Sequence, residues 1–136
     1  HADLPKKFGH RPTQSCTPLY EKFLDAARKA NCALDLNTAG LRKDCKEIYP
    51  SREILALAFA RGVPIAFGSD AHAPGEVGLN FAEAIALARS NTLARAATAG
   101  DAESQFHLGA LHDNGLGVPA DAGQRNAWWQ KAAARS

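Results

Sequence analysis

Asp70 and His72, which follow an apolar run, have the types and spacing that metal chemistry needs. The run Val63–Phe67 is typical of a buried strand, and functional side chains in α/β proteins gather beyond the carboxyl ends of strands. In extended backbone, residues i and i+2 project to the same side, roughly 6–7 Å apart. A carboxylate oxygen and an imidazole nitrogen at that spacing can bind one metal ion or two adjacent ones. The alternative is a capping aspartate and a surface histidine in an ordinary loop.

Histidine and basic residues accompany two other expected strand ends. His1 opens the sequence in a strand-end context with Lys6 and Lys7 behind it, and a polar glycine loop carrying Arg42 follows an expected strand at 33–37. Metal ligands and cations at one rim suit a phosphoryl group, because metals polarise the phosphorus centre and cations hold its oxygens. Each cation taken alone is compatible with a solvated surface charge. Their occurrence at three strand ends predicts a site for a phosphoryl group.

The elements that must position these residues alternate between helix and strand. In chain order we expect a helix from Thr17-Pro18, a strand at 33–37, a helix capped by Ser51 and ended by Gly62, a strand at 63–67 and a helix from Asn80 to about Ser90. The near-continuous apolar run at 63–67 predicts a strand buried on both faces of a parallel sheet. This alternation indicates βα units.

Three motifs resemble a known family. The runs H-x-D-L-x-K-K-F-G, N-T-A-G-L-R-K with K-E-I-Y-P-S, and G-S-D-A-H-x-P-x-x-V-G-x-N-F look like the C-terminal half of a histidinol-phosphatase of the polymerase-and-histidinol-phosphatase (PHP) superfamily. The resemblance covers about residues 1–90. It implies a distorted (β/α)7 barrel with a cluster of divalent metal ions, and hydrolysis of L-histidinol phosphate, a small phosphorylated substrate, in histidine biosynthesis.

The resemblance also implies roles for individual residues. Its motifs place His1, Asp70 and His72 on metal ligands, with Asp70 and His72 in the catalytic centre, and Arg42 on a phosphate-binding arginine. Lys6 or Lys7 stands where relatives often carry a basic residue, commonly arginine. Lysine lacks the bidentate fork of arginine. Imidazole and carboxylate ligands suit Zn, Mn and Fe, so the metal stays open.

The sequence departs from the family pattern in one large respect. The family's first strands supply a His-x-His motif and further His and Glu ligands, which are not present here. We therefore expect this chain alone to be inactive or nearly so. The absence of methionine and the histidine at position 1 suggest that the chain begins in the middle of a longer protein.

After residues 90–92 the pattern changes to alanine-rich helices without strands. Residues 97–133 resemble one Sel1-like repeat, a helical hairpin related to tetratricopeptide repeats, in which Asp121 caps the second helix and Trp128 packs back on the first. Such repeats stack into solenoids that bind partner proteins. The predicted fold class is therefore α/β: a partial PHP-type (β/α) barrel over 1–90, followed by an all-α Sel1-like hairpin over 91–136.

Composition narrows the classes of function. The chain has 136 residues, 46% of them hydrophobic, and a net charge of +2, too balanced to favour a nucleic acid or an anionic membrane as partner. No apolar run approaches the roughly 18 residues of a transmembrane helix. Three cysteines without metal-site spacing favour reduced thiols and a cytoplasmic location. Two alternatives to a phosphatase stay open: a Sel1-type binding scaffold with a vestigial half-barrel, and a truncated or misjoined sequence.

Overall fold

The computed structural model describes residues 1–134. Within them the chain is a mixed α/β structure that is mostly helical, with five α-helices and two short parallel strands. It divides into two compact units, residues 1–84 and residues 85–136. We describe each unit by itself.

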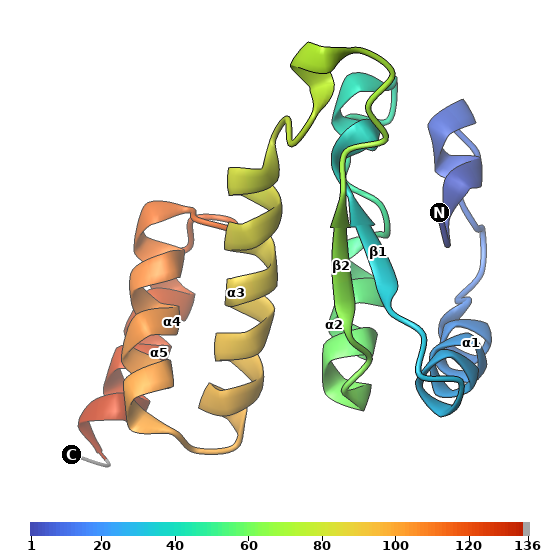
Figure 1. Ribbon diagram of the computed structural model, residues 1–136. Coiled ribbons are helices and arrows are strands. Elements are labelled where there is room, and N and C mark those ends of the chain that lie inside the picture. Colours follow the sequence, from blue (N-terminus) through green and yellow to red (C-terminus); the bar gives the residue numbers. More distant parts are fainter. Residues whose placement is uncertain (135–136) are drawn as a thin grey trace. The chain divides into compact units, whose positions relative to one another are not determined.

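The first unit is built around a two-stranded parallel sheet. Strand β1 (Leu34–Asn37) pairs with β2 (Ile65–Gly68), as Figure 1 shows. In this pairing Asn37 lies opposite Gly68. The other elements are the 3₁₀ helices η1 (Leu4–Phe8), η2 (Thr38–Arg42) and η3 (Pro74–Glu76), and the helices α1 (Thr17–Lys29), α2 (Arg52–Arg61) and the start of α3 (Phe81–Thr98). The connection from β1 to β2 through α2 makes a βαβ unit, so both strands end at the same edge.

Local signals account for the ends of α2. The Ser51 hydroxyl accepts a hydrogen bond from the main-chain N–H of Ile54, and Gly62 ends the helix at φ +68°. Both features confirm the prediction. The start of α1 differs: Thr17 is the first helical residue rather than the cap, and its hydroxyl donates to Glu53 at 2.6 Å.

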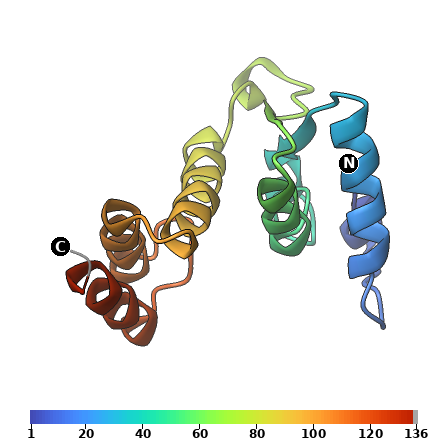
Figure 2. The same ribbon diagram turned by 90° about the horizontal axis from the view of Figure 1, so that it is seen from below.

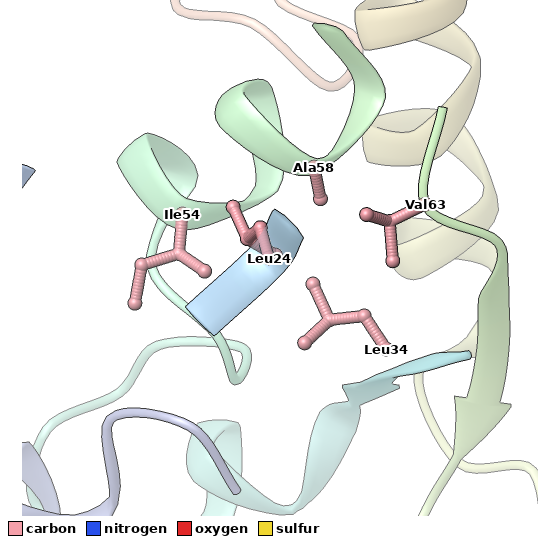
Figure 3. Packing of buried hydrophobic residues seen from close by; sticks show 5 residues of the cluster. All are labelled: Leu24, Leu34, Ile54, Ala58 and Val63. Carbon is pink, nitrogen blue, oxygen red and sulfur yellow. The ribbon is translucent and has the colours of Figure 1, made fainter. Parts of the chain in front are cut away.

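A small apolar core holds the first unit together. Leu24 of α1, Ile54 and Ala58 of α2, Leu34 of β1 and Val63 before β2 pack against one another, as Figure 3 shows, and each is at most 6% exposed. Burial of these side chains fixes both helices against the start of the sheet.

The sheet is less covered than the sequence predicts. Phe67 is 42% exposed and Ala66 is exposed, so the expectation of a strand buried on both faces was wrong for β2. The reason is that the described part of the chain contributes two strands and shows no closed barrel. The partial PHP-type barrel stays a prediction.

The second unit is helical. Helix α3 runs without a break through residues 90–92, where the sequence analysis placed a boundary, and α4 (Ala102–Asn114) and α5 (Ala122–Ala133) lie side by side (Figures 1 and 2). Asp121 caps α5 as predicted, accepting from the N–H of Gln124 at 2.9 Å. The identity of this pair as a Sel1-like repeat stays a prediction, and residues 135–136 of the predicted repeat lie outside the described residues.

Trp129 of α5 packs on the first helix of the pair: its indole lies against Gly109, and its Nε1–H donates to the main-chain oxygen of Phe106 at 3.1 Å. The missing side chain of Gly109 leaves the room that the indole needs. Trp128 borders a cavity together with Gln105 of α4, and its packing on the first helix stays a prediction. None of the helices in residues 1–134 combines the length and hydrophobicity needed to cross a lipid bilayer.

Candidate active site

The carboxyl ends of β1 and β2 bring the predicted site segments together. Helix η2 leaves β1 directly after Asn37, and the loop with Asp70 leaves β2 directly after Gly68. The Thr38 hydroxyl donates to the main-chain oxygen of Leu79 at 2.7 Å and so ties η2 to the end of that loop. The site therefore lies where parallel sheets place their functional groups.

His1 lies between two carboxylates at this edge. Its Nδ1 is 3.4 Å from Asp35 Oδ2 and its Nε2 is 3.9 Å from Asp70 Oδ2. The imidazole stacks on the ring of Tyr49, with ring centres 4.6 Å apart and planes 14° apart, and is 17% exposed. The structure thus brings His1 and Asp70 together and adds Asp35 and Tyr49, which the sequence analysis did not single out.

Tyr49 is held in place by its main chain and by burial. Its main chain exchanges two hydrogen bonds with Asn37, at 2.7 and 2.9 Å, and its side chain is fully buried. Burial raises the pKa of Tyr49 to about 12, and the neighbouring Cys45 side chain adds to the shift. Tyr49 is therefore a neutral, fixed ring beneath His1 at ordinary pH.

The backbone from Asp70 to His72 is not extended, although the i, i+2 spacing argument assumes that it is. Asp70 has φ +47°, so the backbone turns there instead of staying extended. His72 Nδ1 donates to the main-chain oxygen of Asp70 at 2.8 Å, and its main-chain N–H donates to Glu76 at 2.8 Å. The first of these bonds requires the proton on Nδ1, which leaves Nε2 of a neutral His72 with its lone pair.

Arg42 holds this loop in place and has one donor group to spare. Its Nη2 donates to the main-chain oxygens of Ser69, at 2.8 Å, and Asp70, at 3.3 Å, and lies 3.6 Å from a Glu76 carboxylate oxygen. The main-chain N–H of His72 and then the Arg42 charge lower the pKa of Glu76. Nη1 of Arg42 is buried without a hydrogen-bond partner in residues 1–134. Such an orphaned donor suits an incoming oxygen atom.

Lys6 is committed to internal partners. Its side chain is 5% exposed, and its ammonium group donates to the main-chain oxygen of Ile48 at 2.8 Å and pairs with Asp3 at 2.9 Å and Glu47 at 3.5 Å. It also lies 5.1 Å from the centre of the Tyr49 ring. In this structure Lys6 joins η1 to the segment before α2, and its predicted phosphate contact stays a prediction.

A cavity of about 190 Å³ opens beside His1. It is lined by His1, Leu4, Lys7, Ala39, Lys43, Tyr49 and Asp70. Lys7 and Lys43 are both half-buried, and neither ammonium group has an ion pair within residues 1–134. Lys7 lies 5.2 Å from the centre of the exposed Phe8 ring. The cavity therefore combines two unpaired cations with the imidazole and carboxylate of the predicted site.

A larger cavity, about 580 Å³, lies elsewhere in the first unit. It is bordered by the N-terminal segment, Tyr20 of α1 and Glu53 of α2. Of the six predicted site residues, Lys6 borders it and the other five do not. The smaller cavity is the better candidate because it lies at the strand ends.

Three of the predicted site residues carry donor atoms of the kinds that divalent metal ions bind. His1, Asp70 and the free Nε2 of His72 offer nitrogen and oxygen atoms of the right kind, and a metal-binding histidine commonly donates its other N–H to a carboxylate or main-chain oxygen. In residues 1–134, however, no three His, Cys, Asp or Glu side chains are arranged to hold a metal ion. A complete centre needs further ligands besides these.

Comparison with known proteins gives partial matches. No family model matches the chain. It is 48% identical over 85 residues to a probable histidinol-phosphatase of Deinococcus radiodurans, covering 62% of this chain and 32% of that protein. It is 36% identical over 77 residues to the histidinol-phosphatase of Bacillus subtilis, covering 56% and 29%, and 36% identical over 69 residues to a probable histidinol-phosphatase of Schizosaccharomyces pombe, covering 51% and 22%. These matches support a phosphatase of that family.

The matches cover only part of each relative. The chain spans about a third or less of the length of these relatives. They support the resemblance to the PHP-type histidinol-phosphatases. They do not support the predicted Sel1-like repeat. The activity of the whole protein is therefore argued below as a proposal.

Proposed function

We propose that residues 1–84 form one side of the active site of a metal-dependent phosphomonoesterase, which hydrolyses L-histidinol phosphate to L-histidinol and phosphate. The observation that carries the proposal is the cavity at the strand ends, where His1 and Asp70 stand beside the unpaired Lys7 and Lys43. The partial relatives named histidinol-phosphatase support the same reaction.

The residues of the proposed site have different roles. His1, Asp70 and His72 are the proposed ligands of a divalent ion, which when bound polarises the phosphoryl group and lowers the pKa of water. Lys7 and Lys43 line the cavity and neutralise charge on the phosphoryl oxygens. Arg42 does not border the cavity, and its Nη1, which has no partner in residues 1–134, is the proposed donor to a phosphoryl oxygen once the site is complete. Arg42 is held by its bonds to the main-chain oxygens of Ser69 and Asp70 before the substrate arrives, so its free donor stabilises charge without reorganising.

The site as described lacks a full set of ligands, so we propose that the chain by itself is inactive. The test is a chimera in which the 77 aligned residues of the Bacillus subtilis relative are replaced by the matching residues of this chain. Hydrolysis of L-histidinol phosphate and of p-nitrophenyl phosphate is measured with Zn²⁺, Mn²⁺ and Fe²⁺. We expect the chimera to be active and the 136-residue chain to be inactive.

Variants of the chimera test the residues. Asp70→Ala should lower kcat at least about 100-fold, because the site loses a carboxylate that can bind the ion. Asp44→Ala, which removes an exposed carboxylate outside the cavity, is the matched control and should leave turnover unchanged. A folded chimera without activity, or an Asp70→Ala variant as active as the control, would refute the proposal.

A further inference from the structure

We propose that Tyr49 and Asp35 are positioning residues for His1: the Tyr49 ring fixes the plane of the imidazole, and the Asp35 carboxylate fixes which ring nitrogen carries the proton. The result is a His1 whose Nε2 lone pair faces Asp70. What that nitrogen then binds rests on the proposed function, whereas the orientation itself does not.

The Tyr49 ring is suited to set the plane. It is 1% exposed and its main chain is bonded twice to Asn37 at the end of β1, so it has little freedom to move. The imidazole lies on it at 4.6 Å with planes only 14° apart. Lys6 lies 5.1 Å from the same ring and packs it from within the unit. His1 therefore rests on a support that is part of the core.

Asp35 is placed to set the proton. A neutral imidazole has a single N–H, so it can serve one of two facing carboxylates. Asp35 is the nearer, at 3.4 Å from Nδ1, whereas Asp70 is 3.9 Å from Nε2. The nearer negative charge favours the proton on Nδ1. A carboxylate on the other ring nitrogen is also the usual partner of a metal-binding histidine.

Two neighbours determine where the Asp35 carboxylate lies: Asn37 donates a hydrogen bond to it and Gly68 leaves room for it. Asn37 Nδ2 donates to Asp35 Oδ2 at 2.9 Å, two residues along β1. Gly68, opposite Asn37 in the sheet, leaves the space that both side chains occupy: a Cβ there would lie 2.5 Å from Asp35 Oδ1 and 2.7 Å from Asn37 Nδ2. Gly68 therefore allows the carboxylate to lean over β2 toward His1.

The test is heteronuclear NMR of the histidine rings in the 136-residue chain at pH 8.5, where an ordinary imidazole, with a pKa of about 6.5, is neutral. His1 signals are assigned by their loss in His1→Gln. We expect ring protons of His1 to be shifted upfield by the Tyr49 ring, and its ¹⁵N pattern to show the proton on Nδ1. His10, which is exposed and has no ring contact in the described residues, is the internal reference.

Variants separate the two roles. Tyr49→Phe keeps the ring and should keep the upfield shift, whereas Tyr49→Leu should abolish it. Asp35→Ala should keep the upfield shift but return the ¹⁵N pattern to the mixture seen for His10, and Asp44→Ala should change neither. In the active chimera, Asp35→Ala should lower activity about 10–100-fold, and Asp35→Asn, which keeps the shape, should lose less.

Three results would overturn the proposal. The first is a His1 whose ring signals match those of His10 in the unaltered chain, a comparison that needs no variant to fold. The second is an upfield shift that survives Tyr49→Leu in a folded chain. The third is a ¹⁵N pattern that Asp35→Ala leaves unchanged. An inactive chimera, by contrast, would refute the proposed function and leave the NMR result standing.

Discussion

Replacement of Lys6 by methionine separates a structural role from phosphate binding. Methionine keeps much of the length of the side chain and removes the charge. In the structure this takes the cation away from Asp3, which is 13% exposed, and leaves the main-chain oxygen of Ile48 without its donor. Lys6→Met should therefore destabilise the first unit strongly, whatever its effect on ligands.

The size of the effect follows from these contacts. Removing one partner of a buried ion pair costs about 3–5 kcal/mol, and losing a hydrogen bond to a main-chain oxygen costs about 1 kcal/mol. Asp3 keeps the hydrogen bond from the N–H of Ser51, at 2.7 Å, which reduces the penalty. We therefore expect the free energy of unfolding to fall by about 3 kcal/mol. With an m-value of about 1.5 kcal/mol/M, the urea midpoint falls by about 2 M.

The assay is urea unfolding followed through the main-chain amide signals of β1, which report on the first unit alone. Lys7→Met is the matched control: it removes a neighbouring ammonium without ion pairs and should change stability by less than about 0.5 kcal/mol. Inorganic phosphate is then titrated into both variants. If Lys6→Met leaves the midpoint where it was but weakens phosphate binding tenfold, Lys6 binds phosphate and the structural reasoning is wrong.

Two further predictions concern the second unit. Gly109→Ala should lower the free energy of unfolding by about 1–3 kcal/mol despite the better helix propensity of alanine, because the new Cβ meets the Trp129 indole. Unfolding followed by tryptophan fluorescence measures this loss. A loss of stability that persists in a Trp129→Leu background would contradict the reasoning. The hydrogen bonds from Ser104 lower the pKa of Asp101, the cap of α4, from its ordinary value of 3.8. The stabilisation by the charged cap is therefore present above pH 3.8 and is lost as the pH falls through the lower folded value. Amide exchange at Ser104 should therefore speed up as the pH falls below 3.8. Asp101→Asn should remove this pH dependence while keeping the cap. If the pH dependence of exchange is unchanged in Asp101→Asn, another group causes it.

Features that depend on neighbouring residues in the chain could be predicted from the sequence. The caps at Ser51 and Asp121, the left-handed Gly62 and the two strands all have local causes, and the structure has each of them. The signal for Asp35 was also present, since it alternates with the buried Leu34 and Leu36 and so belongs to the other face of β1.

Features that depend on distant contacts, or on side-chain hydrogen bonds that compete with a helix end, could not be predicted from the sequence. Asn91 and Thr92 suggested the end of a helix, yet their side chains donate to the oxygens of Leu87 and Ala88 one turn earlier, and α3 continues. The turn at Asp70 needs a positive φ. Aspartate can adopt this conformation, but its presence in the sequence does not predict it. The burial of Lys6 depends on Ile48, 42 residues away, and no pattern near Lys6 indicates it.

The spacing of contacts along the chain sets an order for folding. In the first unit, bonds that hold the N-terminal segment join residues 42 and 48 positions apart, Lys6 with Ile48 and Asp3 with Ser51. In the second unit, side-chain contacts include Arg125 with Asp113, 12 positions apart, and Ser90 with Gly117, 27 positions apart. Closing long loops slows folding, so the helical unit should form first and the N-terminal segment should dock late. His1 is carried by that segment, so its edge of the sheet is completed only after the rest of the first unit has folded.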